Sequence, residues 1–299
     1  MTTPRLLLVH AHPDDETLTT GGVMARYAAQ GVRVTLVTCT LGEEGQIIPK
    51  RLRGLAADRA DQLGGFRAAE LDGACRALGV TDYRFLGSVG RWRDSGMVWR
   101  RPGQAGPSPD AGPDAFSNAD RQEQVEALVA VLREVRPQVV VTYADDGGYG
   151  HPDHIRAHEI TMAATGCVPE TQRVFHVVPS RDAIHSGLAA LATTSGIPFP
   201  VPDVDELPNV TDESITTVID VRAYLPAKIE ALRAHGTQVS VWLDQWCDGA
   251  GIAAYALSNG VAQPITNREH FVLAAGETEG CADDLFAGLH LEAPTTIGQ

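Results

Sequence analysis

Short apolar segments alternate with longer amphipathic segments through the first half of the chain. The apolar segments are rich in Leu and Val, which is typical of strands buried on both faces of a parallel sheet. In the segments between them, apolar residues recur at helical spacing. Strands are therefore expected at residues 5–9, 32–39, 83–86 and 139–143, and helices at 17–29, 52–78 with a possible break at Gly64-Gly65, 120–135 and from about 151.

This alternation predicts an α/β fold: a Rossmann-like, mostly parallel sheet with helices on both faces. Residues 87–113 are a long stretch rich in Gly and Pro, and its tail, PGQAGPSPDAGP, is expected to be a mobile loop. After about residue 171 the pattern weakens, and only a strand at 173–178 and a helix at 223–234 are expected. The chain is accordingly divided into a Rossmann-like domain, 1–170, and a smaller C-terminal lobe, 171–299.

Composition narrows the classes of function. The 299 residues carry a formal net charge of −14, which argues against nucleic acid and anionic membranes as main partners. No apolar run approaches the ~20 residues of a membrane span, and the N-terminal run is too short for a signal peptide. The five cysteines are spaced singly, so a disulfide framework is not expected and a cytoplasmic location is.

Two similar clusters follow two of the predicted strands. His12-Pro13-Asp14-Asp15 comes after the first strand, and His151-Pro152-Asp153-His154 comes after the strand at 139–143. Ligands bind beyond the carboxyl ends of the strands in such sheets, so both clusters are expected at one edge. Histidines and a carboxylate with one open position are typical of catalytic zinc.

Simpler roles are open for each cluster. Asp14 or Asp15 could cap the helix that follows, and a histidine at a helix start is more often structural. His154 and His158 form a rival pair at H-x-x-x-H spacing, but no Glu follows His154 as in a zincin helix. Glycine-rich motifs that bind dinucleotides or nucleotide phosphates are absent from the sequence.

Five segments give the chain a family resemblance. It resembles the PIG-L/LmbE family of zinc N-deacetylases, and within it the branch that deacetylates N-acetyl-glucosaminyl-inositol in mycothiol biosynthesis. The similarity is dense in the first half and looser later, where it is best around ALSN (256–259) and EHFVLAAG (269–276). The segments are HAHPDDE (10–16), VTCTLGEEG (37–45), ADQLGGFR (60–67), LGSVGRWRDSGM (86–97) and GGYGHPDH (147–154).

The resemblance implies a set of metal ligands and a catalytic base. It implies that His12, Asp15 and His154 bind Zn²⁺, with Fe²⁺ as the alternative ion in cells. It also implies that Asp14 is the general base that accepts a proton from the attacking water. These roles suit the chemistry, because zinc polarises a carbonyl and a nearby carboxylate can accept the proton.

The resemblance assigns further residues around this centre. His151 is expected to stay off the metal as an electrostatic or acid partner supported by Asp153, and Tyr149 to lie near the developing oxyanion. Three residues are expected to bind the substrate: Arg67, Asp94 and Asn259. Departures from the relatives occur at Gln46, where they have an acid, and at 143–146, which read Tyr-Ala-Asp-Asp instead of Tyr-Asp-x-Asn.

The implied function is hydrolysis of the acetamide of 1-D-myo-inositol 2-acetamido-2-deoxy-α-D-glucopyranoside to the free amine and acetate, as a step of mycothiol biosynthesis. The expected partner is thus a small amino-sugar inositol glycoside. Two alternatives are an amidase that acts on mycothiol S-conjugates and a sugar-binding protein without activity. Catalysis is expected in domain 1–170, with the lobe 171–299 completing the substrate pocket.

Overall fold

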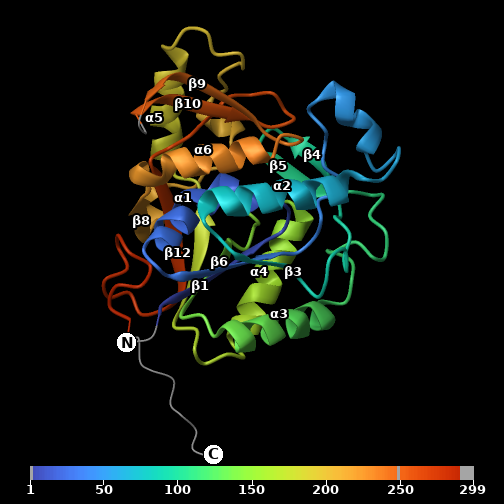
Figure 1. Cartoon of the computed structure of the whole chain (residues 1–299), viewed down its shortest axis with the longest axis vertical. Coiled ribbons are helices and arrows are strands. Elements are labelled where there is room, and N and C mark those ends of the chain that lie inside the picture. The colour runs from blue at the N-terminus through green and yellow to red at the C-terminus, as the bar shows by residue number, and fades with distance from the viewer. Residues whose placement is uncertain (1–2, 248–249, 290–299) are drawn as a thin grey trace, which may run out of the picture.

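A seven-stranded sheet forms the centre of the computed structural model, which describes residues 3–247 and 250–289 (Figure 1). Five neighbouring strands are parallel, and the last two pairings are antiparallel. The order across the sheet is β3 (Asp82–Phe85), β2 (Arg33–Thr38), β1 (Arg5–His10), β6 (Val139–Tyr143), β7 (Arg173–Val178), β12 (Arg268–Gly276) and β8 (Thr217–Asp220).

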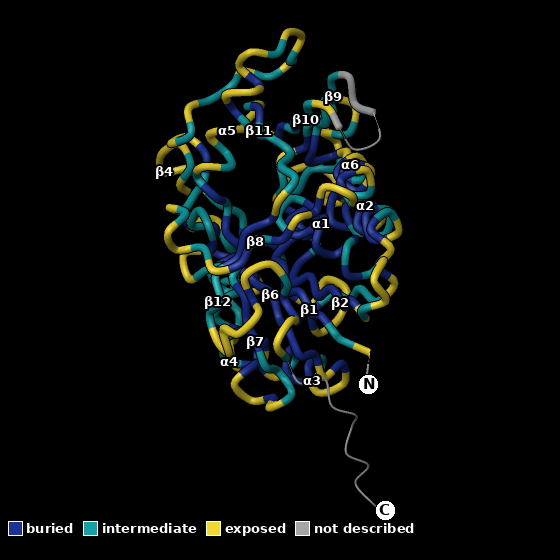
Figure 2. The backbone as a smooth tube through the Cα atoms, turned by 90° about the vertical axis from the view of Figure 1, so that its left-hand side faces the viewer, coloured by how far each residue is buried: buried dark blue, intermediate teal, exposed yellow. Residues whose placement is uncertain are grey.

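Helices cover both faces of this sheet. On one face, α1 (Asp15–Ala29), α2 (Leu63–Leu78) and α6 (Leu225–Ala234) share one hydrophobic core with the strands. On the other face, α3 (Arg121–Val135) and α4 (Pro152–Thr165) form a second core. Figure 2 shows the buried backbone concentrated along the sheet between these layers. The predicted fold class is confirmed.

The strand order reverses direction beside β1. From β1 the chain moves outward to β2 and β3, and β6 then returns to the opposite side of β1. Leu6 pairs with Val139 and Leu8 with Val141, so the carboxyl ends of β1 and β6 lie side by side. Ligands of open α/β sheets bind at such a switch point. Both His-Pro-Asp clusters therefore emerge at one place.

Most predicted elements agree with the structure, with two differences in the first half. The predicted helix at 52–78 is a 3₁₀ turn, η1 (Lys50–Leu55), followed by α2, so the chain between them is not helical. The Gly/Pro-rich stretch 87–113, whose tail is predicted to be a loop, contains a hairpin of β4 (Met97–Arg101) and β5 (Gln104–Pro107). These strands were not predicted because they contain Gly, Pro and exposed residues and lack the buried apolar run by which a strand is recognised in the sequence.

The second half of the chain contributes to the main sheet and also forms a separate one. β7, β8 and β12 continue the central sheet past the predicted boundary at residue 170, so that boundary is not a break in the sheet. β9 (Ser240–Cys247), β10 (Ala250–Ala256) and β11 (Gln263–Pro264) form a small antiparallel sheet. It packs with α5 (Arg181–Ala192) around a third core. This lobe also includes the turns η2 (Val204–Glu206), η3 (Asp212–Ser214) and η4 (Arg222–Tyr224).

A buried ion pair ties the second half of the chain to α1. Lys228 of α6 lies 2.7 Å from Glu269 of β12, and both side chains are buried. Glu269 accepts hydrogen bonds from the backbone N–H groups of Gly22 and Val23, and Lys228 donates to Leu18 O. The two charges thus compensate each other and bind backbone groups in the middle of α1. These contacts fix the middle of α1 against α6 and β12.

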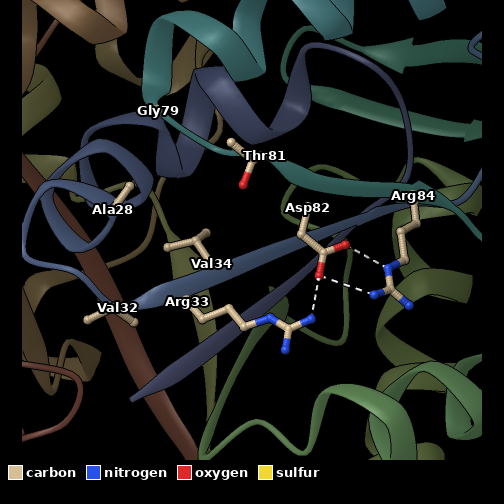
Figure 3. A pocket seen from close by; sticks show the side chains of 8 residues that line it. All are labelled: Ala28, Val32, Arg33, Val34, Gly79, Thr81, Asp82 and Arg84. Carbon is tan, nitrogen blue, oxygen red and sulfur yellow. Dashed lines mark hydrogen bonds and ion pairs between the residues drawn. The ribbon is translucent and has the colours of Figure 1, made fainter. Parts of the chain in front are cut away.

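A hollow of about 410 Å³ lies at the amino ends of β2 and β3 (Figure 3). Its two arginines, Arg33 and Arg84, both contact the carboxylate of Asp82. Because the positive charges are paired, this hollow is not an evident anion site, and it lies at the opposite ends of the strands from the two clusters. In the described part of the chain, no helix combines the length and apolar character needed to cross a membrane.

Candidate metal and catalytic site

Tyr143, the last residue of β6, links the two strand ends at the switch point. Its hydroxyl accepts from the backbone N–H of Ala11 at 2.9 Å and donates to Asp15 Oδ2 at 2.8 Å. The ring stacks on His154 with 4.2 Å between centroids. Asp15 begins α1 and His154 lies in the first turn of α4, so this one side chain holds residues of both clusters in place.

The carboxylate of Asp15 lies between two imidazoles. Its Oδ2 atom is 3.2 Å from His12 Nδ1 and 3.3 Å from His154 Nε2. Two ligand atoms bound about 2.1 Å from a tetrahedral zinc ion lie about 3.4 Å apart. All three side chains are nearly fully buried. Each of these two distances therefore fits a pair of atoms that share one divalent ion.

The hydrogen bonds of His154 leave one ring nitrogen free for a metal. His154 Nδ1 lies 3.1 Å from Gly147 O, and a carbonyl can only accept, so Nδ1 carries the hydrogen. Nε2 then presents a lone pair. It is buried and has no hydrogen-bond partner, although it contacts Asp15 at ion-pair distance. An uncompensated buried acceptor facing a carboxylate is unfavourable, and a cation between them would relieve it.

His12 faces three carboxylates. Its Nε2 atom lies 3.3 Å from Asp153 and 3.5 Å from Asp94, while Nδ1 faces Asp15. Burial lowers the pKa of His12, but these carboxylates raise it well above its usual value. A proton on Nδ1 and a metal ion there are alternative ways to balance the facing charges. His12 can therefore bind a metal through Nδ1, with Asp153 holding the opposite nitrogen.

His151 lies close to the same group but is bound differently. Ligand atoms of His12, His151 and His154 all lie within 4.8 Å of one another. However, His151 is the N-cap of α4, and its Nδ1 accepts from the backbone N–H of Asp153 at 3.1 Å. Burial and the neighbouring histidines lower the pKa of His151 well below its usual value. The neutral ring then carries its hydrogen on Nε2, which makes that atom a donor instead of a metal ligand.

Asp153 supports this region in two ways. Its backbone N–H donates a hydrogen bond to His151 Nδ1. Its carboxylate contacts His12 Nε2 and accepts hydrogen bonds from the backbone N–H and the hydroxyl of Ser95. The sequence predicted support of His151 by Asp153, and the structure places the carboxylate against His12. The contact to His151 is made by the backbone.

Asp14 lies in a strained conformation beside His12, Asp15 and His154, which together are called the metal group below. Its φ of 128° is a region that residues other than glycine rarely adopt. Its carboxylate lies 3.1 Å from the guanidinium of Arg67, which also donates to Gly42 O and Pro13 O. Burial raises the pKa of Asp14 to about 6, and the charge of Arg67 opposes that rise.

Tyr149 covers the group from the loop after β6. Its ring packs edge-on against His154, with 5.0 Å between centroids, and stacks on Trp99 of β4 at 5.9 Å. The backbone of this loop is bound to β5, because Ala105 N donates to Tyr149 O at 2.7 Å. A Cβ at Gly150 would lie 2.7 Å from Ala105 O, so glycine permits this approach. A cavity of about 770 Å³ lies between the hairpin, this loop and residues 205–209.

The predicted substrate-binding residues are only partly brought together. Asp94 is buried next to His12 and accepts from the backbone N–H groups of Glu44 and Gly96. Arg67 lies against Asp14, as described above. Asn259 is exposed in the turn after β10, where Val261 N donates to its side chain. No contact joins it to the metal group within the described residues. Gln46 is also exposed.

Three residues of the site were not predicted from the sequence. Tyr143 positions Asp15, and Ser95 positions Asp153. Tyr143 ends the predicted strand at 139–143 and Ser95 lies within the segment 86–97, but no spacing marks either of them as a site residue. Tyr255 of β10 lies near enough to Asp14 for that charge to contribute to raising the pKa of its phenol, although burial is the larger cause. It comes from a part of the chain whose pattern predicted no element.

Comparison with known proteins places this geometry in a family context. The family model described as PIG-L, GlcNAc-PI de-N-acetylase, matches residues 7–165. A protein of Saccharopolyspora erythraea named 1D-myo-inositol 2-acetamido-2-deoxy-alpha-D-glucopyranoside deacetylase 1 is 67% identical over 99% of this chain and 97% of its own length. A protein of Actinosynnema mirum named as the same deacetylase is 60% identical over 96% of this chain and 97% of its own.

Solved structures share the fold at low identity. The 4-carboxy-2-hydroxymuconate hydratase GalB of Pseudomonas putida aligns with a TM-score of 0.51 and 18% identity, over 78% of each chain. That neighbour is named as a hydratase, so the fold alone does not fix the reaction. The reaction must be argued from the site and from the family.

Proposed function

Because this chain belongs to the PIG-L family of de-N-acetylases, we propose that it is a metal-dependent hydrolase that removes the acetyl group from 1-D-myo-inositol 2-acetamido-2-deoxy-α-D-glucopyranoside. This is the step of mycothiol biosynthesis expected from the sequence. The observation that carries the proposal is the contact of Asp15 with both His12 and His154, beside the carboxylate of Asp14. Two relatives that match nearly the whole chain bear this name.

The proposed metal ligands are His12, Asp15 and His154. Their support is the spacing about Asp15 Oδ2 and the free Nε2 of His154. His151 is left out, since the capping bond to its Nδ1 puts the hydrogen on the nitrogen that would have to bind the ion. Two imidazoles and one carboxylate suit Zn²⁺, and Fe²⁺ accepts the same donors. When bound there, such an ion polarises a carbonyl and acidifies water.

Asp14 is the proposed general base. A pKa of about 6 leaves its carboxylate ionised at neutral pH while keeping it more basic than an ordinary aspartate. It takes the proton of the water that attacks the acetyl carbon. Arg67, 3.1 Å away, orients the carboxylate and keeps its pKa from rising further.

Tyr149 and His151 are the proposed donors to the oxyanion. Tyr149 keeps its proton, because burial raises the pKa of its phenol above the usual value. His151 carries a hydrogen on Nε2, as its capping bond requires. Two donors aimed at the position where negative charge develops would stabilise the tetrahedral state. The proton that Asp14 takes from the water is then available to the departing amine, whereas His151, whose pKa lies well below its usual value, acts as a neutral donor oriented by the backbone N–H of Asp153.

The remote ring of the substrate is proposed to contact Arg67, Asp94 and Asn259, with the lobe 171–299 completing the pocket. Arg67 and Asp94 support this by their position beside the base and His12. Tyr255 of the lobe supports it by lying near Asp14. A guanidinium and a carboxylate together can bind vicinal hydroxyls.

Acetate release tests the proposal. Purified protein loaded with Zn²⁺ is given the acetylated inositol glycoside, plain N-acetylglucosamine or a mycothiol S-conjugate, each beside a chelated sample. Fast release of acetate from the glycoside, much slower release from N-acetylglucosamine, and loss on chelation are expected. Cleavage of the S-conjugate in preference to the glycoside would instead identify an amidase, and sugar binding without any hydrolysis would contradict an enzymatic function.

A further inference from the structure

The backbone at Asp14 needs a partner that holds it. At φ 128° and ψ −34° this residue lies outside the ordinary regions for a side chain with a Cβ. Such a conformation is unfavourable by itself and persists only where surrounding contacts enforce it. The backbone N–H of Asp14 donates to Glu16 Oε2 at 2.9 Å. Glu16 is therefore one of the groups that hold the base in its unusual conformation.

Glu16 is in turn held by a residue that is distant in the sequence. Its side chain is fully buried, and its second oxygen, Oε1, accepts from His235 Nε2 at 2.7 Å. His235 is fully buried as well and follows α6 directly. The two residues are 219 positions apart in the chain. The hydroxyl of Thr17 also donates to Oε1, so without His235 the buried carboxylate would keep only donors from its own segment of the chain.

The segment that carries His235 is itself fixed on both sides. Thr237 donates from its backbone N–H and its hydroxyl to the two oxygens of Glu70 on α2, at 2.8 and 2.6 Å. Its carbonyl accepts from Ile48 N at 2.9 Å. His235 is thus fixed relative to α2, which also carries Arg67, the ion-pair partner of Asp14.

We propose that His235 is a positioning residue for the reaction, which fixes the general base Asp14 by holding Glu16 in place. The inference rests on the proposed function, in which Asp14 is the base. Through this chain of contacts the lobe after residue 170 would act on the chemical step without touching the substrate. A displacement of about 1 Å in a catalytic group can lower a rate by about 100-fold.

The competing explanation is that the contact between Glu16 and His235 only stabilises the fold. A second buried pair in the chain provides a matched control. Lys228 and Glu269 also form a buried pair between the C-terminal half and α1, but they contact the middle of the helix at Leu18, Gly22 and Val23. Replacing Lys228 tests loss of a buried ion pair at α1 without touching Asp14. Lys228→Met should lower the melting temperature and leave kcat per metal-loaded chain within about twofold.

The test compares amide side chains of two lengths at position 235. His235→Gln can place its amide N–H near the position of Nε2, whereas His235→Asn reaches only about as far as Nδ1. His235→Leu removes the donor. We expect Gln to keep kcat within about threefold, and Asn and Leu to lose about 10–100-fold. KM and bound metal should stay near wild type in all three, since neither the ligands nor the substrate contacts are altered.

The outcomes distinguish a failure of the proposed role of His235 from a failure of the proposed deacetylase function. Equal kcat values for wild type, His235→Asn and His235→Gln would overturn the positioning role, as would a loss of metal in step with activity. A kcat loss in Lys228→Met as large as that in His235→Asn would also overturn it, by assigning the effect to stability. If the wild type released no acetate, the proposed function would fail, and the role of His235 with it. Should His235→Leu not fold, the Asn and Gln pair decides.

Discussion

The guanidinium of Arg67 lies 3.1 Å from the carboxylate of Asp14, and both side chains are buried at the edge of the metal group. Resemblance to the family had assigned Arg67 to the substrate. In the structure its charge also acts on Asp14, because it opposes the rise in pKa that burial causes. Arg67 therefore links the position of the base to its proton affinity.

The pH dependence of kcat should report this pair. With a pKa of about 6, Asp14 loses its proton as the pH rises through about 6, and a nearby divalent cation would lower that value. The acid limb of kcat is therefore expected at or below about pH 6. Removing the positive charge in Arg67→Met should shift that limb upward by roughly one unit. Arg76→Met, an exposed arginine on the same helix, should leave it unchanged. A limb that stays in place in Arg67→Met would mean that another group titrates.

Stability and activity should change in opposite directions in Asp14→Asn. Asp14 has a pKa above its unfolded value, so the fold disfavours the ionised form, and this cost grows as the pH rises from about 4 to about 6 and then stays constant. Asn resembles the protonated acid and avoids the cost. The metal-free variant should gain on the order of 1–3 kcal/mol in free energy of unfolding at pH 7 and nothing near pH 3.5. Its turnover with metal should fall by about 10²–10⁴.

Urea unfolding at the two pH values, with metal analysis and acetate release, tests that prediction. Asp15→Asn serves as the comparison, since it should lose bound metal whereas Asp14→Asn should keep it. The reverse pattern, with metal lost in Asp14→Asn and kept in Asp15→Asn, would exchange the roles of the two carboxylates.

Metal binding should distinguish the histidines of α4. His154→Ala removes a proposed ligand and should weaken Zn²⁺ binding by more than about 10–100-fold, which is the typical loss when a residue that only hydrogen-bonds to a metal ligand is replaced. His158→Ala should keep full metal content, because its Nδ1 contacts Tyr143 O outside the group around Asp15. His151→Ala should also keep its metal but lose turnover. Competition with a chromophoric chelator measures all three, and loss of metal in His151→Ala would add His151 to the ligand set.

Asp94 should influence both the metal and the choice of substrate. Its Oδ1 atom lies 3.5 Å from His12 Nε2, so Asp94→Ala is expected to weaken metal binding modestly. At saturating metal, the variant should lose more activity on the inositol glycoside than on N-acetylglucosamine, because a lost hydroxyl contact matters only for the larger substrate. Equal losses on both substrates would restrict Asp94 to support of His12. Steady-state kinetics at fixed free Zn²⁺ gives the answer.

The sequence predicted the sheet and the two clusters well because their signals are local. β1 and β6 are continuous apolar runs that end directly before the His-Pro-Asp segments, and parallel strands bring their carboxyl ends to one edge. The hairpin β4–β5 was missed because its strands are short, exposed and rich in Gly and Pro. The strands of the small sheet likewise follow no strict alternation of apolar and polar residues that would predict them from the sequence.

The parts of the site that could not be predicted from the sequence depend on contacts between segments that are distant in the chain. The carboxylate of Asp153 contacts His12, whereas its backbone N–H contacts His151. This division depends on the turn that begins α4, and the spacing of the residues in the sequence does not predict it. His235 gave no signal at all, since its partner Glu16 lies near the other end of the sequence. Burial of Arg67 against Asp14 similarly depends on how α2 packs against the loop after β2.

Titration of metal into chelated protein tests the central claim most directly. Zn²⁺ is added in steps, and the bound metal and the rate of acetate release from the inositol glycoside are measured on the same samples. Activity is expected to rise in proportion to bound metal and to reach its plateau at about one ion per chain, with His154→Ala showing neither tight binding nor the rise. Acetate release that is undiminished in metal-free protein, or a fully loaded protein that leaves the glycoside intact, would contradict the account.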